Sequence, residues 1–124
     1  MNAFNMAKTA YSNSASPTRT LRGTEYDAFA RITHRMKNSA TDPSKFNILA
    51  TALYENNKLW SILAADVADK DNTLPKALRG QIFYLYEFTT QHSRKVLRKK
   101  ASVDALVDIN TAVMRGLRSE VGAL

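Results

Sequence analysis

Acidic residues in one short segment are the first candidates for chemistry in this chain of 124 residues. Asp69, Asp71 and Thr73 fall where a calcium-binding EF-hand loop has its first, third and fifth ligand positions. Such a loop also requires glycine at its sixth position and a bidentate glutamate at its twelfth. Leu74 and Gly80 occupy those two positions here. The segment is therefore predicted to be a polar turn, and no metal site is expected.

The other residue types that usually carry catalysis are isolated or absent. The two histidines, His34 and His92, have no ligand spacing such as H-E-x-x-H. His92 falls on an apolar helical stripe, which favours a histidine in or at the edge of the core over a metal ligand. The chain has no cysteine, and its four glycines are too scattered to form a phosphate-binding loop. We therefore expect no catalytic residue, no cofactor and no enzymatic activity.

Positive charge is the most prominent chemical feature of the sequence. The net charge is +7, and residues 73–101 hold seven Lys or Arg against one Glu. Such an excess attracts nucleic acid or an acidic protein surface. The favoured interpretation is a solvated helix end, where cations complement the helix dipole. The basic patch comprises Arg94, Lys95, Arg98, Lys99 and Lys100.

Binding to nucleic acid is kept as an alternative function, that of a small basic helical regulator that binds mRNA. Against it, the sequence contains no recognised nucleic-acid-binding module. The aromatic residues near the basic patch also lie at core spacing rather than between the basic residues. Direct contact with nucleic acid is therefore the second choice, behind binding to a protein.

Helices must position these residues, because apolar residues recur with a period of 3.6 and hardly ever alternate. The chain length suits one domain, and 44% hydrophobic residues suit a packed core. We predict an all-α fold, a small antiparallel helical bundle of about four to five helices. Residues 1–124 form a single domain in this prediction, with 1–17 as a loosely ordered N-terminal arm. The expected helices cover residues 2–12, 23–38, 43–69, 74–100 and 103–118.

Two long helices carry apolar stripes at heptad spacing. Their members step alternately by three and four residues, and a connection of about five residues predicts an antiparallel hairpin. Asn56 is a polar member of the first stripe, where a buried amide fixes register if it finds partners. The first stripe comprises Phe46, Leu49, Leu53, Asn56, Trp60, Leu63 and Val67, and the second comprises Leu78, Ile82, Leu85, Thr89, His92 and Val96.

Local sequence signals mark where the helices begin. Asp42 is the expected N-cap of a helix with Pro43 in its first position, and Ser102 is expected to cap the last helix. Two shorter stripes complete the predicted core. They comprise Tyr26, Phe29, Thr33 and Met36, and Val103, Leu106, Val107, Asn110, Val113, Met114 and Leu117.

The longest apolar run, residues 82–86, is far shorter than the roughly 20 residues of a membrane span, so no membrane contact is expected. The first residues also lack the features of a signal peptide, and the absence of cysteine suits a reducing cytoplasm.

The helix expected over 74–100 is apolar on almost every side from Ile82 to Phe88. Such a helix is predicted to lie at the centre of the bundle or to supply a surface for a partner. A β-strand is the less favoured alternative for this run.

Four blocks of the sequence carry a further signal. They are Glu25–Phe29 with Arg31–Thr33, Asn56–Asp66 (NNKLWSILAAD), Leu74–Arg79 (LPKALR) and Val107–Leu117 (VDINTAVMRGL). In their order and spacing these blocks resemble the FlaF family, which comprises flagellar biosynthesis regulators of alphaproteobacteria. The resemblance spans about residues 17–117, and a longer N-terminal arm and the pair Lys99-Lys100 depart from the family pattern.

The resemblance implies a cytosolic, non-enzymatic protein that is needed for flagellin production. It implies a flagellin-binding export chaperone that also regulates flagellin synthesis, with coupling to FlbT, a translational regulator of flagellin. An amphipathic helix of the client would pack against the bundle, as in other helix-in-groove complexes. Flagellin is therefore the expected partner, with FlbT as a second one.

Candidate client-binding residues lie in the helices over 43–69 and 74–100. Aromatic side chains dominate the energetics of interfaces, and they are therefore the first choice as anchors. Trp60 and Leu78 lie on the stripes, so a core role is favoured for both, whereas Phe83 and Tyr86 lie off the stripe. The full set of candidates is Asn56, Trp60, Asp66, Leu78, Phe83 and Tyr86.

Overall fold

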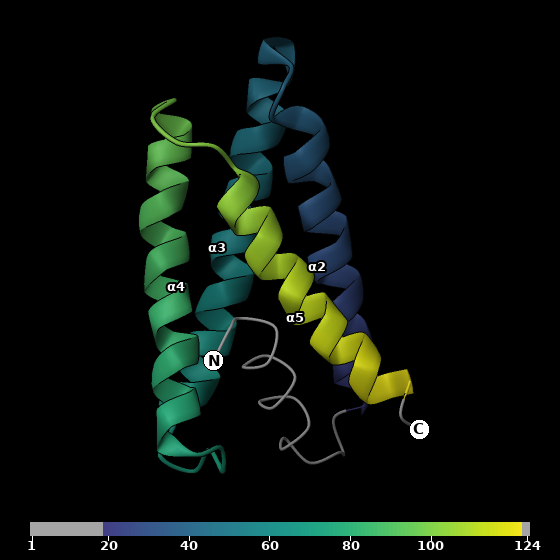
Figure 1. Ribbon diagram of the computed structural model, residues 1–124, viewed down its shortest axis with the longest axis vertical. Coiled ribbons are helices and arrows are strands. Elements are labelled where there is room, and N and C mark those ends of the chain that lie inside the picture. Colours follow the sequence, from purple (N-terminus) through teal and green to yellow (C-terminus); the bar gives the residue numbers. More distant parts are fainter. Residues whose placement is uncertain (1–18, 123–124) are drawn as a thin grey trace.

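The computed structural model describes residues 19–122, and of their side chains those of residues 26–115. Within this part of the chain the structure contains α-helices, one short 3₁₀ helix and no strand, which confirms the all-α prediction (Figure 1). The helix predicted over 2–12 and the arm over 1–17 lie outside the described residues. The elements are α2 (Arg19–Ser39), η1 (Pro43–Lys45), α3 (Phe46–Ala68), α4 (Lys76–Leu97) and α5 (Asp104–Gly122).

Helix α3 is the central helix, because it packs against α2 on one side and α4 on the other. Short connections make α2, α3 and α4 antiparallel neighbours, and α5 crosses over α2 (Figure 1). Contacts between α4 and α5 are few, so α3 holds α4 almost alone. Helix α4 is therefore an edge helix. Among the described helices, none combines the length and the apolar character that a membrane crossing requires.

The turn before α3 is built from the predicted cap. The carboxylate of Asp42 accepts hydrogen bonds from the backbone N–H of Ser44, at 3.0 Å, and from its hydroxyl, at 2.7 Å. These two bonds hold the pKa of Asp42 below its ordinary value, and the positive charge of Lys45 acts in the same direction. Pro43 then opens a single turn of 3₁₀ helix, and regular α-helix begins at Phe46.

Polar groups close the turn between α3 and α4. The backbone N–H of Asp71 donates to the carboxylate of Asp69, and the side-chain amide of Asn72 donates to the carbonyl of Asp66. Arg79 reaches back from α4 and donates from Nε to the carbonyl of Val67, at 2.9 Å, which satisfies one of the last carbonyls of α3. The acidic residues of this segment thus form the predicted polar turn.

Helix α4 ends three residues earlier than the sequence predicts. Lys99 adopts a left-handed backbone conformation with φ of 61°, and its N–H donates to the carbonyl of Val96. The N–H of Lys100 donates to the carbonyl of Lys95, at 2.8 Å. These two bonds form a Schellman motif, which terminates the helix and usually has glycine at the left-handed position. The sequence has no glycine at the left-handed position to mark the end of the helix, and the predicted end of α4 is therefore too late in the chain.

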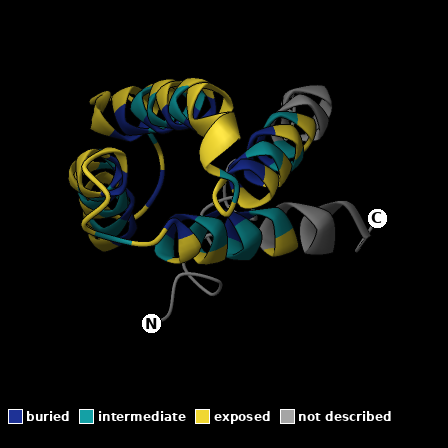
Figure 2. Ribbon diagram, turned by 90° about the horizontal axis from the view of Figure 1, so that it is seen from above, coloured by how far each residue is buried: buried dark blue, intermediate teal, exposed yellow. Residues whose placement is uncertain are grey.

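Two clusters of buried side chains form the core, on the inward sides of the helices (Figure 2). Phe29 and Trp60 meet edge to face in the first cluster, with ring centroids 5.9 Å apart. The first core cluster comprises Phe29, Trp60, Val67, Leu74, Leu78, Ile82 and Val113. The second core cluster comprises Ile32, Met36, Leu49, Ala52, Leu53, Val96, Val103 and Leu106.

The buried stripes differ in part from the heptad seams. Phe46 is exposed and Leu63 is only half-buried, whereas Ala52 and Ala64 are buried. Helix α3 packs against α2 on one side and α4 on the other, so its buried face is wider than the seam of a two-helix hairpin.

Candidate partner-binding surface

Three of the predicted client-binding residues lie inside the protein rather than on its surface. Asn56 and Trp60 are buried in α3, and Leu78 is buried in the first core cluster. A partner of the folded domain cannot touch these side chains, because neighbouring helices cover them. The prediction of direct client contact is corrected for these residues, and the core role favoured for Trp60 and Leu78 is the one they have.

A network of hydrogen bonds explains why polar groups are buried at this place. The indole Nε1–H of Trp60 donates to Oδ1 of Asn110, at 3.0 Å. The amide Nδ2 of Asn110 donates to Oγ1 of Thr33, at 3.1 Å, and to Oδ1 of Asn56, at 2.7 Å. The network joins α2, α3 and α5 through one asparagine. Its role is to fix how the three helices meet, as buried polar groups do in other bundles.

Aromatic side chains on the outer side of α4 are the best-placed surface feature. Phe83 is 39% exposed and Tyr84 is 65% exposed, whereas Tyr86 is half-buried and packs against the first core cluster. The rings of Phe83 and Tyr86 meet edge to face with centroids 5.6 Å apart. Tyr86 thus contacts both the core and the ring of Phe83. We call these three residues the aromatic face.

The structure brings Phe83 and Tyr86 together as the sequence predicted, and it adds Tyr84. Around the helix, Phe83 lies between the other two rings, since successive residues are about 100° apart. Tyr84 also lies off the stripe but was not among the predicted client-binding residues. The all-round apolar run from Ile82 to Phe88 was the available signal, since such a helix at the edge of a bundle must expose apolar side chains.

Gly80 lies one turn before Phe83 and Tyr84 and is exposed. A Cβ atom built at this position would have no neighbouring atom within 4 Å. Nothing in the described domain therefore requires glycine here, although glycine in a helix costs about 1 kcal/mol relative to alanine. Its effect is to leave the backbone of α4 accessible beside the aromatic face.

Asp66 is exposed near the C-terminal end of α3, just before the turn that leads into α4. Its backbone carbonyl accepts bonds from the turn, from the backbone N–H of Asp69 and the side chain of Asn72. Among the predicted client-binding residues, Asp66 therefore joins Phe83 and Tyr86 as one that reaches the surface.

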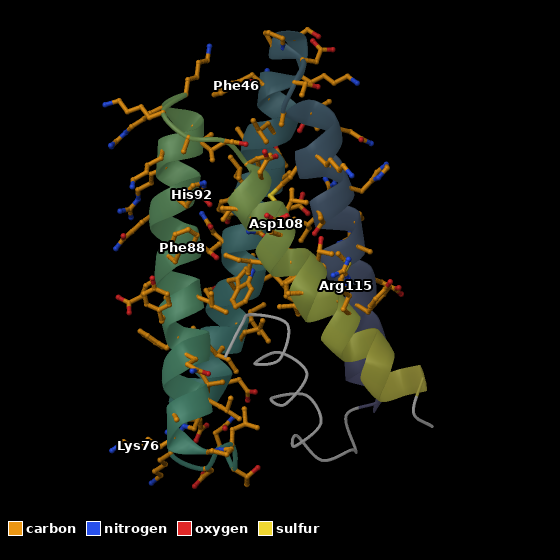
Figure 3. The ribbon with its side chains drawn as sticks, in the orientation of Figure 1. Phe46, Lys76, Phe88, His92, Asp108 and Arg115 are labelled. Carbon is orange, nitrogen blue, oxygen red and sulfur yellow. The ribbon has the colours of Figure 1, made fainter. Side chains whose placement is uncertain are left out.

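His92 is part of the scaffold rather than of the surface site. Its ring stacks on Phe88, one turn away along α4, with centroids 5.3 Å apart (Figure 3). Its Nε2–H donates to the backbone carbonyl of Ser102, at 2.7 Å. The histidine thus fastens the α4–α5 connection to α4, which agrees with a position at the edge of the core. Among residues 19–122, no group of three or more His, Asp or Glu is arranged to hold a metal ion.

The basic patch occupies the C-terminal end of α4 and the connection that follows. All five members, Arg94, Lys95, Arg98, Lys99 and Lys100, are exposed. The outer side of α4 therefore changes character along its length, from the aromatic face near its beginning to positive charge at its end. This arrangement suits a partner segment with apolar and acidic parts.

One comparison with known proteins finds a match. The model of a family described as flagellar protein FlaF matches residues 7–117, which is nearly the whole chain. Neither the curated proteins nor the solved structures contain a match.

Proposed function

Because this chain belongs to the FlaF family of flagellar proteins, we propose that it binds flagellin before export, through the aromatic face of α4. In this proposal the protein acts in the cytoplasm as a chaperone without catalytic activity. Flagellin binding would also make it a regulator of flagellin synthesis, because the fraction of this protein that is bound to flagellin depends on how much flagellin awaits export. FlbT, a translational regulator of flagellin, is the proposed second partner in that regulation.

Exposure of the aromatic face is the observation that carries the proposal. Exposed aromatic side chains strengthen binding to a partner that covers them. The terminal segments of flagellin become amphipathic helices in the filament, and their apolar sides aggregate if they stay uncovered. A client helix that packs along α4 would cover Phe83 and Tyr84, and its backbone would approach most closely at Gly80.

The test compares a pair of exposed aromatic substitutions on α4 with a single aromatic substitution on α3. The double variant Phe83→Ala/Tyr84→Ala removes the aromatic face, and Tyr54→Ala removes a ring on α3 that is 68% exposed. Each variant is produced in a flagellated host, and the amount of flagellin that co-purifies is measured. The double variant should recover at least about tenfold less flagellin, since a hot-spot residue contributes about 2 kcal/mol.

The Tyr54→Ala control should recover flagellin as the unchanged protein does. Circular dichroism must give the same helical signal and the same melting temperature for all three proteins. Equal recovery by a well-folded double variant would exclude the aromatic face as the binding surface. Tyr86 is left unchanged, because it packs on the core and its removal would confuse binding with stability.

The five exposed members of the basic patch support the alternative, a regulator that binds mRNA. The discriminating measurement is retention on RNA over a series of salt concentrations. Phosphate contacts predict a steep loss of affinity with salt, of about one unit of log–log slope for each cation involved. Recovery of RNA without flagellin, together with such a slope, would favour the alternative.

A further inference from the structure

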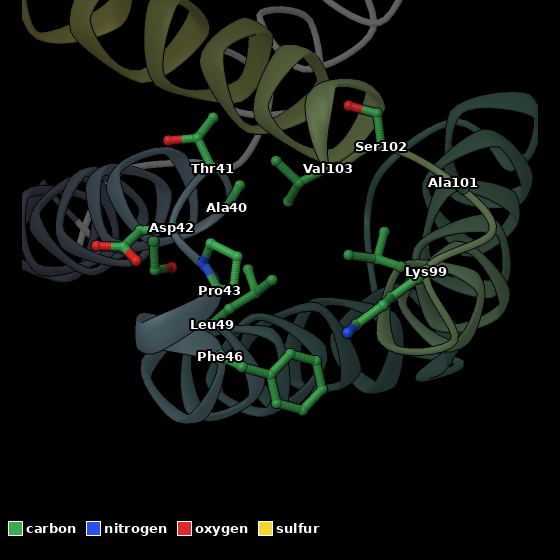
Figure 4. Close-up of a pocket in the computed structure, with 12 residues that line it drawn as sticks. Ala40, Thr41, Asp42, Pro43, Phe46, Leu49, Lys99, Ala101, Ser102 and Val103 are labelled. Atoms are coloured by element: carbon green, nitrogen blue, oxygen red, sulfur yellow. The ribbon is translucent and has the colours of Figure 1, made fainter.

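Two connections meet at the end of the bundle opposite the α3–α4 turn (Figure 1). Between them lies a cavity that is open to solvent on one side (Figure 4). The turn between α2 and α3 forms one wall, and the connection between α4 and α5 forms the other. The cavity volume is about 320 Å³. This lies at the lower end of the range for ligand pockets and suits one or two side chains rather than a large cofactor.

The floor of the cavity is apolar. Leu49, Val96 and Val103 line it, and all three belong to the second core cluster. Ala101 and Pro43 extend the apolar surface toward the rim. The group that fits such a floor is an aliphatic or aromatic side chain, because a charged or strongly polar group would lose its water without gaining a partner.

The lining of the cavity contains one positive charge, that of Lys99, and further cations adjoin the lining residues in the sequence. The ammonium group of Lys99 lies over the ring of Phe46, 5.8 Å from its centroid. Arg98, Lys100 and Lys45 are exposed nearby along the chain. The one carboxylate in the lining, that of Asp42, points away from the cavity (Figure 4) and accepts two hydrogen bonds from Ser44.

The backbone of Lys99 gives an independent reason to expect a function for its side chain. Lysine occupies the left-handed position of the Schellman motif, where glycine is the favoured residue. Residues held in such strained conformations cluster at functional sites. Here the strained residue is also the one whose charged group stands at the edge of the cavity.

From the apolar floor and the positive rim we infer that this cavity binds an acidic segment of a partner protein, which inserts a single apolar side chain. A nucleic acid would match the charge of the rim but has no aliphatic group for the floor. The ammonium group of Lys99 lies over one face of the Phe46 ring, where it competes with a base that would stack there. The geometry therefore favours an acidic peptide.

This end cavity is separate from the aromatic face. Phe83 lies fourteen positions before Leu97, the last residue of α4, which corresponds to about 21 Å along the helix, and Lys99 lies beyond that end. The inference therefore does not rest on flagellin binding. It gives the protein a second surface, and one partner at each end of α4 would not exclude the other.

A synthetic peptide provides the probe. It has about twelve residues, all Asp or Glu except for one central leucine, and carries a fluorescent label. Binding to the full chain is measured by fluorescence anisotropy at low salt. Lys99→Gly should weaken binding by about fivefold, since one charge-assisted contact is lost. Glycine is the favoured residue at this backbone position, so the variant keeps its fold.

A matched control removes the same charge elsewhere. Lys70→Gly changes an exposed residue in the turn at the opposite end of the bundle, and it should leave peptide binding unchanged within about twofold. A peptide with serine in place of leucine should bind about tenfold more weakly, because the apolar floor then gains nothing. Ala40→Phe, which fills the cavity from its exposed rim, should also abolish binding of the leucine peptide.

Three results would overturn the inference. The first is equal binding of the leucine and serine peptides, which would mean that charge alone holds them. The second is equal loss of binding in Lys99→Gly and Lys70→Gly. The third is displacement of the leucine peptide by a single-stranded oligonucleotide of about twelve nucleotides at lower concentrations than by the unlabelled peptide, which would assign the end cavity to nucleic acid.

Discussion

The indole Nε1–H of Trp60 donates a hydrogen bond to Oδ1 of Asn110 across 3.0 Å of the bundle interior. The two residues belong to α3 and α5, and both are buried. The NH₂ group of the same Asn110 amide donates to the hydroxyl of Thr33 in α2 and to the amide oxygen of Asn56 in α3. One side chain thus connects three helices, and its removal leaves several buried polar groups without a partner.

Asn110→Ala should lower the free energy of unfolding by about 2–4 kcal/mol, because the indole N–H of Trp60 and the amide oxygen of Asn56 lose their partner in the interior. Urea unfolding followed by circular dichroism measures the loss. Trp60 is the only tryptophan of the chain, so its fluorescence reports on the same site.

Thr111→Ala on the neighbouring position of α5 is the control. Among the described residues, the hydroxyl of Thr111 bonds only the carbonyl of Val107 in its own helix. Its loss should change stability by no more than about 0.5 kcal/mol. Equal effects of the two substitutions would mean that the network contributes nothing beyond the packing of α5.

Local chemistry made the beginnings of the helices predictable. Asp42 and Pro43 open η1 and α3, and Ser102 accepts a hydrogen bond from the N–H of Asp104 at the start of α5, each as predicted. Such signals depend on residues a few positions apart. The end of α4 was not predictable in the same way, because Lys99 takes a conformation that usually requires glycine.

Contacts between distant segments could not be read from the sequence. Asn56 and Asn110 were recognised as polar members of apolar stripes, yet their hydrogen bond joins residues 54 positions apart. It depends on the angle at which α5 crosses the bundle, and no local pattern specifies that angle. The same holds for the end cavity, which forms only where two connections meet.

The candidate site was predictable in part for a similar reason. Phe83 and Tyr86 lie off the stripe, and this was sufficient to favour them as surface residues over Trp60 and Leu78. Helical periodicity separates the inside of a helix from its outside. It does not reveal that α4 lies at the edge of the bundle, which is what leaves Tyr84 exposed.

Gly80→Ala should raise the free energy of unfolding by about 0.5–1 kcal/mol, since the new methyl group meets no atom and the unfolded chain loses freedom. Thermal unfolding followed by circular dichroism measures the change. Ala65→Gly, on the exposed side of α3, should shift stability by a similar amount in the opposite direction.

The same variant also tests the proposed approach of a client helix at Gly80. If the client backbone lies close to this residue, Gly80→Ala should recover less flagellin although the protein is more stable. A gain in stability with unchanged recovery would place the client helix elsewhere. The single variant Gly80→Ala thus distinguishes an effect on stability from an effect on flagellin binding.

Asp42 should make the stability of the protein fall at low pH. Hydrogen bonds from Ser44 lower the pKa of Asp42 in the folded protein relative to the unfolded chain. The resulting stabilisation is fully present above the pKa of the unfolded chain, about 3.9, and is lost as the pH falls through the folded value. Asp42→Asn keeps an acceptor that does not titrate. The melting temperature of the unchanged protein should therefore drop relative to that of the variant below about pH 4, and a constant difference from pH 7 downward would contradict this role.

Lys99→Gly should stabilise the protein, although it removes a side chain and a charge. Lysine in the left-handed conformation costs about 1 kcal/mol, and glycine adopts it without strain. Both hydrogen bonds of the Schellman motif involve backbone atoms only and are kept. Urea unfolding should show a gain of about 1 kcal/mol. Arg98→Gly, at the neighbouring position with a negative φ, should instead lose stability. If Lys99→Gly were destabilising, the contact between Lys99 and Phe46 would outweigh the strain, and Lys99 would be retained for stability rather than for the acidic partner.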